Sequence, residues 1–244
     1  MIDRNIEQRV LKLTFSRAEK RNALTHSAYG QLATALGEAS DDDDIDCIVI
    51  SGAGGNFTAG HDLAELARLQ PLEVGPAPED WPVNQFVLAL ADCRKPVIAA
   101  VKGSAIGIGL TMLLHCDLVY ASRRSRFAAP FVALGLVPEA ASSLLLPAQV
   151  GLHRANEILL LGESFDAAEA LHMGLVNALF EDADLEQEVM IRARKICNAD
   201  KEAVSMTKTL VRTSRQSLVA CLLRESACFA ERLDKIVTSA SRSG

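Results

Sequence analysis

Glu139 stands in a sequence environment suited to moving a proton. Between Phe127 and Leu146 it is the only charged residue. An apolar environment disfavours the charged form of a carboxylate, which makes that carboxylate a better proton acceptor at neutral pH. The alternative is structural, because Glu139 follows Pro138 and an acidic residue in the first turn of a helix is favoured by the helix dipole. The sequence thus allows two roles for Glu139, a general base or an acid at a helix start.

Two glycine-containing turns could hold negative charge on an oxygen atom. The first is Phe57–Leu63 and the second is Gly103–Gly109, and each precedes an expected helix. N–H groups in the first turn of a helix have no acceptor within that helix, so they can donate to an oxyanion. Gly107 and Gly109 flank Ile108, which allows the backbone at position 108 to approach a ligand closely. Taken alone, a turn of the first kind is more often structural than functional, and the second is equally consistent with simple packing of a helix on a strand.

Other reactive motifs are weaker. The second turn is not the GxGxxG of a dinucleotide site, because position 112 is methionine, and it lacks the lysine of a phosphate-binding loop. His115, Cys116 and Asp117 are neighbours in sequence, which does not make a catalytic triad, and His115 is better explained as a core histidine. No pair of histidines has the spacing of metal ligands. We therefore expect no metal and no nucleotide cofactor.

Composition narrows the class of protein. Of the 244 residues 49% are apolar, which supports a sizeable buried core, and the net charge of −6 argues against a nucleic-acid partner. Six cysteines without a CxxC pair fit free thiols in a reducing compartment. Residues 1–10 lack the apolar stretch of a signal peptide, and no apolar run is long enough to cross a bilayer. We expect a cytoplasmic protein with no membrane partner.

The elements that must position the candidate residues alternate along the first half of the chain. Apolar or alternating runs at 10–15, 47–50, 96–101 and 117–121 predict strands, and glycine turns follow two of them. Residues 26–39 have apolar side chains at helical spacing. This repetition of strand, turn and helix predicts an α/β fold.

The second half of the chain has a helical pattern. Helices are expected at 153–161, 165–173, 184–198, 201–214 and 217–235. Gly162 and Gly174 are expected to end the first two of these helices. We divide the chain near residue 190. Residues 1–190 form a core with the active site, and residues 191–244 form a C-terminal helical region that packs on the core or on a neighbouring subunit.

Taken together and in order, these segments resemble the crotonase (enoyl-CoA hydratase/isomerase) superfamily. Lys20–Leu24 is similar to the family's first coenzyme A segment, Phe57–Leu63 to its AGxDL loop, and Gly103–Gly109 to its second oxyanion turn. His115–Asp117 resembles the CD pair that follows, and the match covers about residues 5–235. The resemblance implies a crotonase-like superhelix of repeated ββα turns. It also implies C-terminal helices for oligomerisation, as a homotrimer or a dimer of trimers.

The resemblance implies roles for individual residues. The main-chain N–H groups of His61 and Ile108 would hold the thioester oxygen of an acyl-CoA substrate, and the imidazole of His61 receives no role. Coenzyme A is part of the substrate, and no separate cofactor is implied. Residues expected to contact the substrate or its coenzyme A are Asn22, Ala23, Leu24, Ala59, Gly60, Asp62, Leu63, Gly107 and Phe131. Residues 70–82 contain four prolines, and we expect this loop to shape the acyl pocket.

Departures from the family pattern indicate the reaction. Hydratases of this family use two glutamates, and the corresponding positions here are Thr111 and Phe131. Neither side chain can act as a base, so hydration is disfavoured. The segment PF-x-x-LG-x-x-PE-x-x-SS instead resembles peroxisomal-type Δ3,Δ2-enoyl-CoA isomerases, whose PE glutamate is the catalytic base and corresponds to Glu139. A bulky aliphatic residue such as Ile108 in the second turn also resembles that branch.

Two alternatives remain open at this point. The first is an enoyl-CoA hydratase-like activity in which Glu139 acts on water. The second is a module that binds an acyl-CoA or a protein without catalysis. The family often ends in a segment whose lysine helps to bind phosphate, whereas this chain has Arg232–Lys235 and a serine-rich tail. The sequence therefore assigns no cation to the coenzyme A phosphates.

Overall fold

A six-stranded sheet forms the centre of the computed structural model, which describes residues 1–66, 80–212 and 214–242. The strand order is β1-β2-β3-β4-β6-β9. The strands are β1 (Ile2–Glu7), β2 (Val10–Phe15), β3 (Cys47–Gly52), β4 (Val97–Val101), β6 (Leu118–Ser122) and β9 (Ala178–Phe180). Strands β1 and β2 form an antiparallel hairpin, and every later pairing in this sheet is parallel. The wholly apolar runs of β3 and β4 are typical of strands that are covered on both faces.

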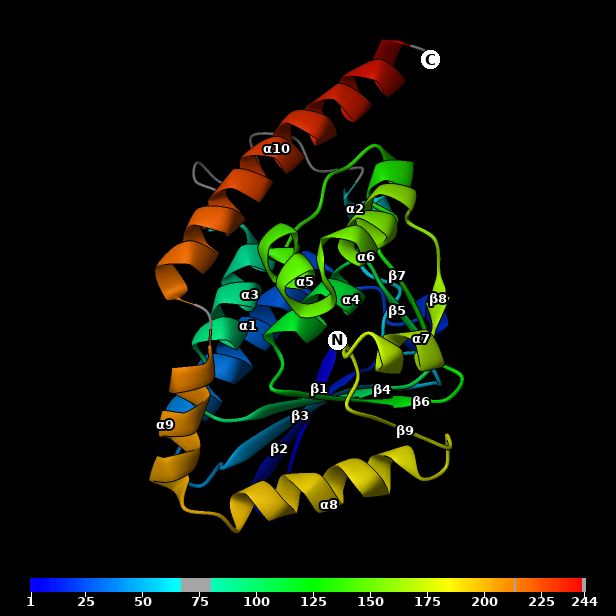
Figure 1. The fold of residues 1–244 in the computed structure, drawn as a ribbon. Coiled ribbons are helices and arrows are strands. Elements are labelled where there is room, and N and C mark those ends of the chain that lie inside the picture. Colours follow the sequence, from blue (N-terminus) through cyan, green and yellow to red (C-terminus); the bar gives the residue numbers. More distant parts are fainter. Residues whose placement is uncertain (67–79, 213, 243–244) are drawn as a thin grey trace.

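Helices cover both faces of this sheet. Helices α1 (His26–Asp41) and α3 (Pro82–Asp92) pack together on one face, and α8 (Leu185–Cys197) crosses the other face (Figure 1). Side chains alternate between the two faces of a strand. Ile48 and Ile50 accordingly join the core cluster with α1 and α3, whereas Val49 joins the cluster with α8.

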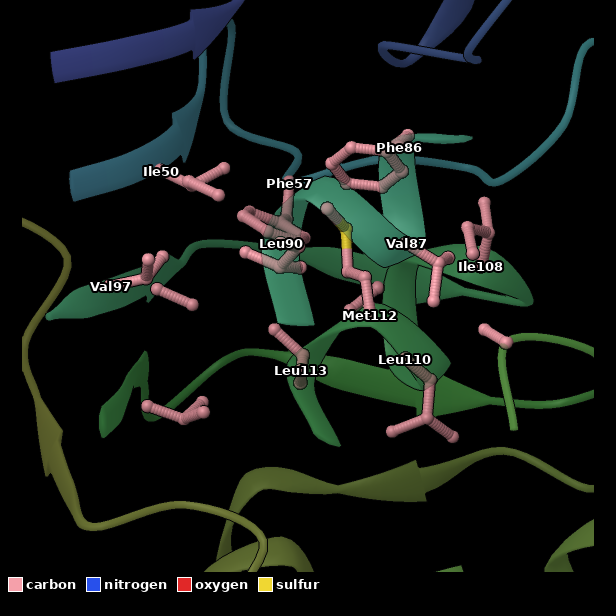
Figure 2. Close-up of a cluster of buried hydrophobic side chains, with 14 of the residues drawn as sticks. Ile50, Phe57, Phe86, Val87, Leu90, Val97, Ile108, Leu110, Met112 and Leu113 are labelled. Atoms are coloured by element: carbon pink, nitrogen blue, oxygen red, sulfur yellow. The ribbon is translucent and has the colours of Figure 1, made fainter. Parts of the chain in front are cut away.

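A smaller, three-stranded sheet carries the second glycine turn. It consists of β5 (Ser104–Ile106), β7 (Arg126–Ala128) and β8 (Phe165–Asp166). Helix α4 (Ile108–Thr111) starts two residues after β5 and continues into the 3₁₀ helix η3 (Met112–His115). Figure 2 shows Met112 and Leu113 of η3 among the side chains of Phe57 and Leu90, so this short helical segment is anchored in the main core.

The remaining helices surround these sheets. They are η1 (Ala18–Lys20), α2 (Leu63–Leu66), η4 (Val132–Leu134), α5 (Ser142–Val150), α6 (Leu152–Asn156), the π-helical η5 (Glu157–Leu161), α7 (Ala167–His172), α9 (Lys201–Val211) and α10 (Arg215–Arg242). The far end of α10 extends beyond the rest of the chain (Figure 1). No helix in the described ranges combines the length and the apolar character needed to span a bilayer.

The predicted strands and the long C-terminal helices are confirmed, with differences at their ends. Strand β1 was not predicted, because it is an edge strand in which only Ile2 is buried and its sequence therefore lacks an apolar alternation. The predicted helix at 165–173 begins with the two residues of β8, which pair with β7. Gly162 and Gly174 adopt φ values of 66° and 76° at the predicted helix ends, a conformation that favours glycine.

Helix α9 and the residue that follows it are tied to the core by charges that are buried or partly buried. The carboxylate of Asp117 accepts hydrogen bonds from Lys208 Nζ at 2.7 Å and from Arg212 Nη2 at 3.1 Å. Position 190, where we divided the chain, lies inside α8, which is one continuous helix packed on the central sheet.

Candidate active site

The first glycine turn is held against the end of β5. The N–H of Thr58 donates to the carbonyl of Ser104 at 2.9 Å, and the N–H of Ile106 donates to the carbonyl of Thr58 at 3.1 Å. Gly60 has a φ of +93°, and a Cβ atom at this position would lie 2.8 Å from the carbonyl oxygen of Ile106. A side chain at position 60 would therefore push His61 away from the second turn.

The second turn meets the first from the other side. Gly107 has a φ of +56° and donates its N–H to the carbonyl of Ala128 at 2.9 Å. A Cβ atom on Gly109 would lie 2.6 Å from Cγ2 of Thr58. The two turns, about fifty residues apart in sequence, are thus packed directly on each other.

The N–H groups of His61 and Ile108 are unpaired within the described residues. The neighbouring N–H groups are used, because Gly60 donates to Thr58 Oγ1 and Asp62 donates to the carbonyl of Leu24. Ile108 is the first residue of α4, so its N–H has no acceptor in the helix. Two free main-chain donors in adjoining turns are what an oxyanion site requires.

Glu139 lies in the turn between η4 and α5, and this turn has an unusual backbone. Ala140 and Ala141, which follow it, adopt φ values of 59° and 54°. His115 Nε2 lies 2.7 Å from the carbonyl oxygen of Ala140, and the N–H of Ala141 donates to Glu225 at 2.7 Å. Left-handed alanines cost conformational energy and persist where the surroundings hold them. The backbone turn that carries Glu139 is therefore held by contacts from η3 and α10.

Glu139 does not serve as the acid at a helix start. Helix α5 begins at Ser142, and the side chain that accepts from its first N–H groups is Glu225 on α10. Glu139 instead points one carboxylate oxygen, Oε2, at His61 Nε2 over 2.7 Å. The other oxygen, Oε1, is buried and has no hydrogen-bond partner among the described residues.

The pocket beside Glu139 is mainly apolar. Its lining includes Tyr29 of α1, Trp81 and Val83 near the start of α3, and Phe229 and Leu233 of α10. Trp81 and Pro82 come from the end of the predicted acyl-pocket loop, whereas residues 70–79 of that loop lie outside the described residues. A buried carboxylate with a free oxygen in such a pocket can take a proton from a carbon acid.

The imidazole of His61 is part of the site, which the sequence did not indicate. Its Nδ1 lies 2.7 Å from the hydroxyl of Tyr29, a residue that the sequence analysis did not single out. Burial lowers the pKa of His61, but the negative charges of Glu139 and Glu65 and the hydrogen bond to Glu139 outweigh burial, so the net shift is upward. Burial raises the pKa of Tyr29 well above its ordinary value, with Glu139 and Glu65 adding to it.

The two predicted coenzyme A segments lie side by side. Leu24 forms a parallel bridge with His61, and the N–H of Ala59 donates to the carbonyl of Arg21 at 2.9 Å. Asn22 is buried, and its side-chain amide donates to the carbonyls of Ala53 and Asn56. The side chain of Asn22 therefore holds the loop together, and its backbone is also engaged, because its N–H donates to the carbonyl of Arg17 and its carbonyl accepts from Thr58 Oγ1.

The other predicted contact residues have distinct surroundings. Asp62 accepts from the N–H groups at the start of α2 and pairs with Arg17 at 2.6 Å, while Leu63 is exposed. Phe131 is buried, with Cε1 about 4.0 Å from a Cβ built on Gly107. Thr111 is also buried. Because threonine and phenylalanine have no carboxylate, neither of the two positions expected for the hydratase glutamates offers a base.

Comparison with known proteins identifies the family. The sequence model described as enoyl-CoA hydratase/isomerase matches residues 5–240. The chain belongs to this family. Among solved structures, an enoyl-CoA hydratase/isomerase from Pseudoalteromonas atlantica T6c is 40% identical with a TM-score of 0.90, covering 99% of this chain and 96% of that one.

Relatives of the chain catalyse more than one reaction. Enoyl-CoA delta isomerase 2 of Rattus norvegicus is 35% identical over 85% of this chain and 53% of its own length, so the chain spans about half of that relative. A 1,2-epoxyphenylacetyl-CoA isomerase of Escherichia coli is 33% identical over 86% of this chain and 81% of its own length. A probable enoyl-CoA hydratase of Mycobacterium bovis is 34% identical over 91% of this chain and 86% of its own length. These relatives have in common that each is named for a reaction of a coenzyme A compound. Their reactions differ, so the reaction of this chain must be argued from its site.

Proposed function

We propose that the chain is a Δ3,Δ2-enoyl-CoA isomerase that moves a proton between C2 and C4 of a 3-enoyl thioester. The observation that carries this proposal is the buried carboxylate of Glu139 beside an apolar pocket, with one oxygen that has no hydrogen-bond partner among the described residues. The similarity of the chain to enoyl-CoA delta isomerases of rat and mouse supports the same reaction.

The reaction needs one base and one oxyanion site. The thioester oxygen accepts hydrogen bonds from the N–H groups of His61 and Ile108, which acidifies the hydrogens on C2. Glu139 takes a proton from C2, the electron pair moves into a dienolate, and the two N–H groups hold the resulting charge on oxygen. The protonated Glu139 then returns the proton at C4, which leaves the double bond between C2 and C3. Protein side chains and backbone supply every group in this sequence, so the proposal includes no metal and no cofactor apart from the coenzyme A of the substrate.

Hydration is the less favoured reaction. Water addition in this family uses two glutamates, and the aligned residues Thr111 and Phe131 have no carboxylate. With Glu139 alone, one carboxylate would have to activate water and also supply a proton to carbon. The isomerase needs only that the same carboxylate takes and returns one proton.

The test replaces the base and screens the substrate. Turnover of 3-enoyl-CoA thioesters by wild type and by Glu139→Gln is followed beside turnover of a 2-enoyl substrate such as crotonyl-CoA. We expect isomerisation by wild type and a loss of ~10²–10⁴-fold in kcat for Glu139→Gln. Near-normal turnover by Glu139→Gln would overturn the assignment of the base. Formation of a 3-hydroxy product as the main reaction would favour a hydratase, and acyl-CoA binding without turnover of any substrate would favour a binding module.

The coenzyme A contacts are part of the proposal. We infer that the segments Asn22–Leu24 and Ala59–Leu63 receive the coenzyme A portion, since they adjoin each other and the unpaired N–H of His61. Gly107 and Phe131 flank the thioester on the other side. Affinity for coenzyme A is expected to fall in Ala23→Pro, which would disturb the backbone at the first segment.

Assembly and location are further parts of the proposal. We propose a homotrimer or a dimer of trimers in the cytoplasm. Helix α9 exposes apolar side chains, with Leu210 82% and Val211 77% exposed, which supports a subunit contact there. All six cysteines are free, in keeping with a reducing compartment. Light scattering on the purified chain tests the assembly, and cell fractionation tests the location.

A further inference from the structure

Tyr29, His61 and Glu139 form a hydrogen-bonded row in the site, in which Tyr29 and Glu139 are buried and His61 is partly buried. Tyr29 Oη lies 2.7 Å from His61 Nδ1, and His61 Nε2 lies 2.7 Å from Glu139 Oε2. The three residues come from α1, the first glycine turn and the turn before α5. Tyr29 is fully buried and Glu139 is 7% exposed, so bulk water competes little for these contacts.

The chemistry of the row determines where its protons lie. Tyr29 stays protonated at neutral pH, because burial raises its pKa well above the ordinary value. An ionised Glu139 can only accept, so the ring proton of a neutral imidazole lies on Nε2 and Nδ1 accepts from the Tyr29 hydroxyl. In an imidazolium both nitrogens carry protons. Nε2–H therefore donates to the Glu139 carboxylate in either state of His61.

One oxygen of Glu139 is thus occupied and the other is not. The hydrogen bond from His61 engages Oε2, whereas Oε1 has no partner within the described residues. Rotation of the carboxylate plane away from this position would break the hydrogen bond to His61. The imidazole therefore restricts the plane of the Glu139 carboxylate and leaves its second oxygen without a partner among the described residues.

We propose that the His61 side chain is a positioning residue that holds the Glu139 carboxylate in the orientation needed for proton transfer, and that Tyr29 fixes the tautomer in which His61 does so. This inference rests on the proposed isomerase function, in which Glu139 is the base. His61 also offers its main-chain N–H to the oxyanion site. One residue then fixes the base relative to the thioester oxygen, which is the geometry that a proton transfer from C2 requires.

The test separates positioning from folding. In His61→Leu the backbone N–H remains and the hydrogen bond to Glu139 is lost, so we expect kcat for a 3-enoyl-CoA to fall by roughly 10- to 100-fold with KM little changed. In His61→Gln the side-chain amide can again donate to Glu139, and we expect recovery of most of the lost kcat. Tyr29→Phe should show a smaller fall than His61→Leu, because only the control of the tautomer is lost.

Matched variants serve as controls. His172 is exposed on α7, and Tyr120 lies on β6 beside Arg192, away from the pocket. His172→Leu and Tyr120→Phe are expected to retain the wild-type kcat. Thermal unfolding of every variant shows whether a fall in kcat accompanies a loss of fold.

Several outcomes would overturn the inference. They are an unchanged kcat in His61→Leu, a fall of the same size in His61→Gln, or a fall that follows the loss of thermal stability across the variants. These outcomes differ from failure of the proposed function. If Glu139→Gln retains turnover, the isomerase mechanism fails. If Glu139→Gln is inactive while His61→Leu matches wild type, only the role of the imidazole fails.

Discussion

Two buried glutamates lie on either side of the Ala140–Ala141 turn, and they differ in how their oxygens are used. Glu139 and Glu225 are 7% and 6% exposed, so burial does not distinguish them. Glu225 accepts from the N–H of Ala141 at 2.7 Å through Oε2 and from the N–H of Ser143 at 2.8 Å through Oε1. Glu139 has a partner on one oxygen only.

The difference separates a structural carboxylate from a reactive one. Buried polar atoms in folded proteins are almost always hydrogen-bonded, so a buried oxygen without a partner calls for an explanation. Burial raises the pKa of Glu225, although its hydrogen bonds from Ser143 and Ala141 oppose that rise. Both oxygens of Glu225 hold the backbone, whereas Oε1 of Glu139 has no partner among the described residues. The unpaired oxygen, rather than burial, distinguishes the glutamate that we propose as the base.

The largest expected effect is that of Glu139→Gln on activity without an effect on stability. The substitution removes the basic oxygen while keeping the size of the side chain, so the ~10²–10⁴-fold loss of kcat should come with an almost unchanged free energy of unfolding. Chemical denaturation of the same protein samples that are assayed checks this. A large loss of stability in Glu139→Gln would show that Glu139, like Glu225, stabilises the fold. It would contradict the distinction drawn between the two glutamates.

Glu225→Ala should show the opposite result, a large loss of stability with a smaller loss of activity. It leaves the buried N–H groups of Ala141 and Ser143 without an acceptor, and we expect a loss of about 2–4 kcal/mol in the free energy of unfolding. Activity should fall less than in Glu139→Gln, because Glu225 acts only through the turn. Glu231→Ala, an exposed glutamate on the same helix, is the control and should unfold as wild type does. Equal stability of the two alanine variants would contradict a clamping role for Glu225.

His115, whose imidazole contacts the carbonyl of Ala140 in the same turn, predicts a pH dependence of stability. Burial lowers the pKa of His115 to about 4, with Arg212 adding to the shift and the hydrogen bond to Ala140 opposing it. The unfolded chain protonates this histidine near its ordinary pKa of about 6.5. Stability from the neutral histidine is therefore full above about pH 6.5 and is lost as the pH falls toward 4, by up to roughly 3 kcal/mol.

Denaturant unfolding of wild type and His115→Gln between pH 4 and 7 measures the contribution of His115 to the free energy of unfolding. The variant should lack that part of the decline, whereas His153→Gln, an exposed histidine at α6, should retain it. A parallel decline in all three proteins would rule out His115 as its source. Glu225 acts with the opposite sign, because its pKa is raised and its stabilising contribution diminishes as the pH rises through that pKa.

The smallest expected effect concerns the start of the same loop. Arg232 Nε on α10 donates to the carbonyl of Gly135 at 2.7 Å. Arg232→Ala should cost about 1 kcal/mol, since the carbonyl can turn to water once the guanidinium is gone. Arg224→Ala on the same helix, which has no such carbonyl partner among the described residues, is the matched control. A larger loss for Arg232→Ala than for Glu225→Ala would show that the loop is held at Gly135 rather than at Ala141.

Sequence reasoning located the groups that depend on local pattern. The glycine turns were predictable because glycine favours the positive φ values at Gly60 and Gly107, and a Cβ at Gly60 would lie 2.8 Å from the carbonyl oxygen of Ile106. Glu139 was singled out because it is one charge in a long apolar run, and its role as a base stays a prediction. The strands and the C-terminal helices followed from apolar periodicity, and the family followed from the order of the motifs. The edge strand β1 was missed because one buried residue makes no pattern.

Tertiary structure alone decided which side chains meet. The contacts of His61 with Tyr29 and Glu139 span 32 and 78 residues, and the contact of Ala141 with Glu225 spans 84. No local pattern encodes such pairs, because they depend on which loops adjoin at the ends of the two sheets and on where α10 docks. The sequence by itself singled out the proposed base and the two proposed main-chain donors. The fold decided that the His61 imidazole contacts Glu139, and that a second glutamate, 86 residues beyond the first, holds the turn that carries Glu139.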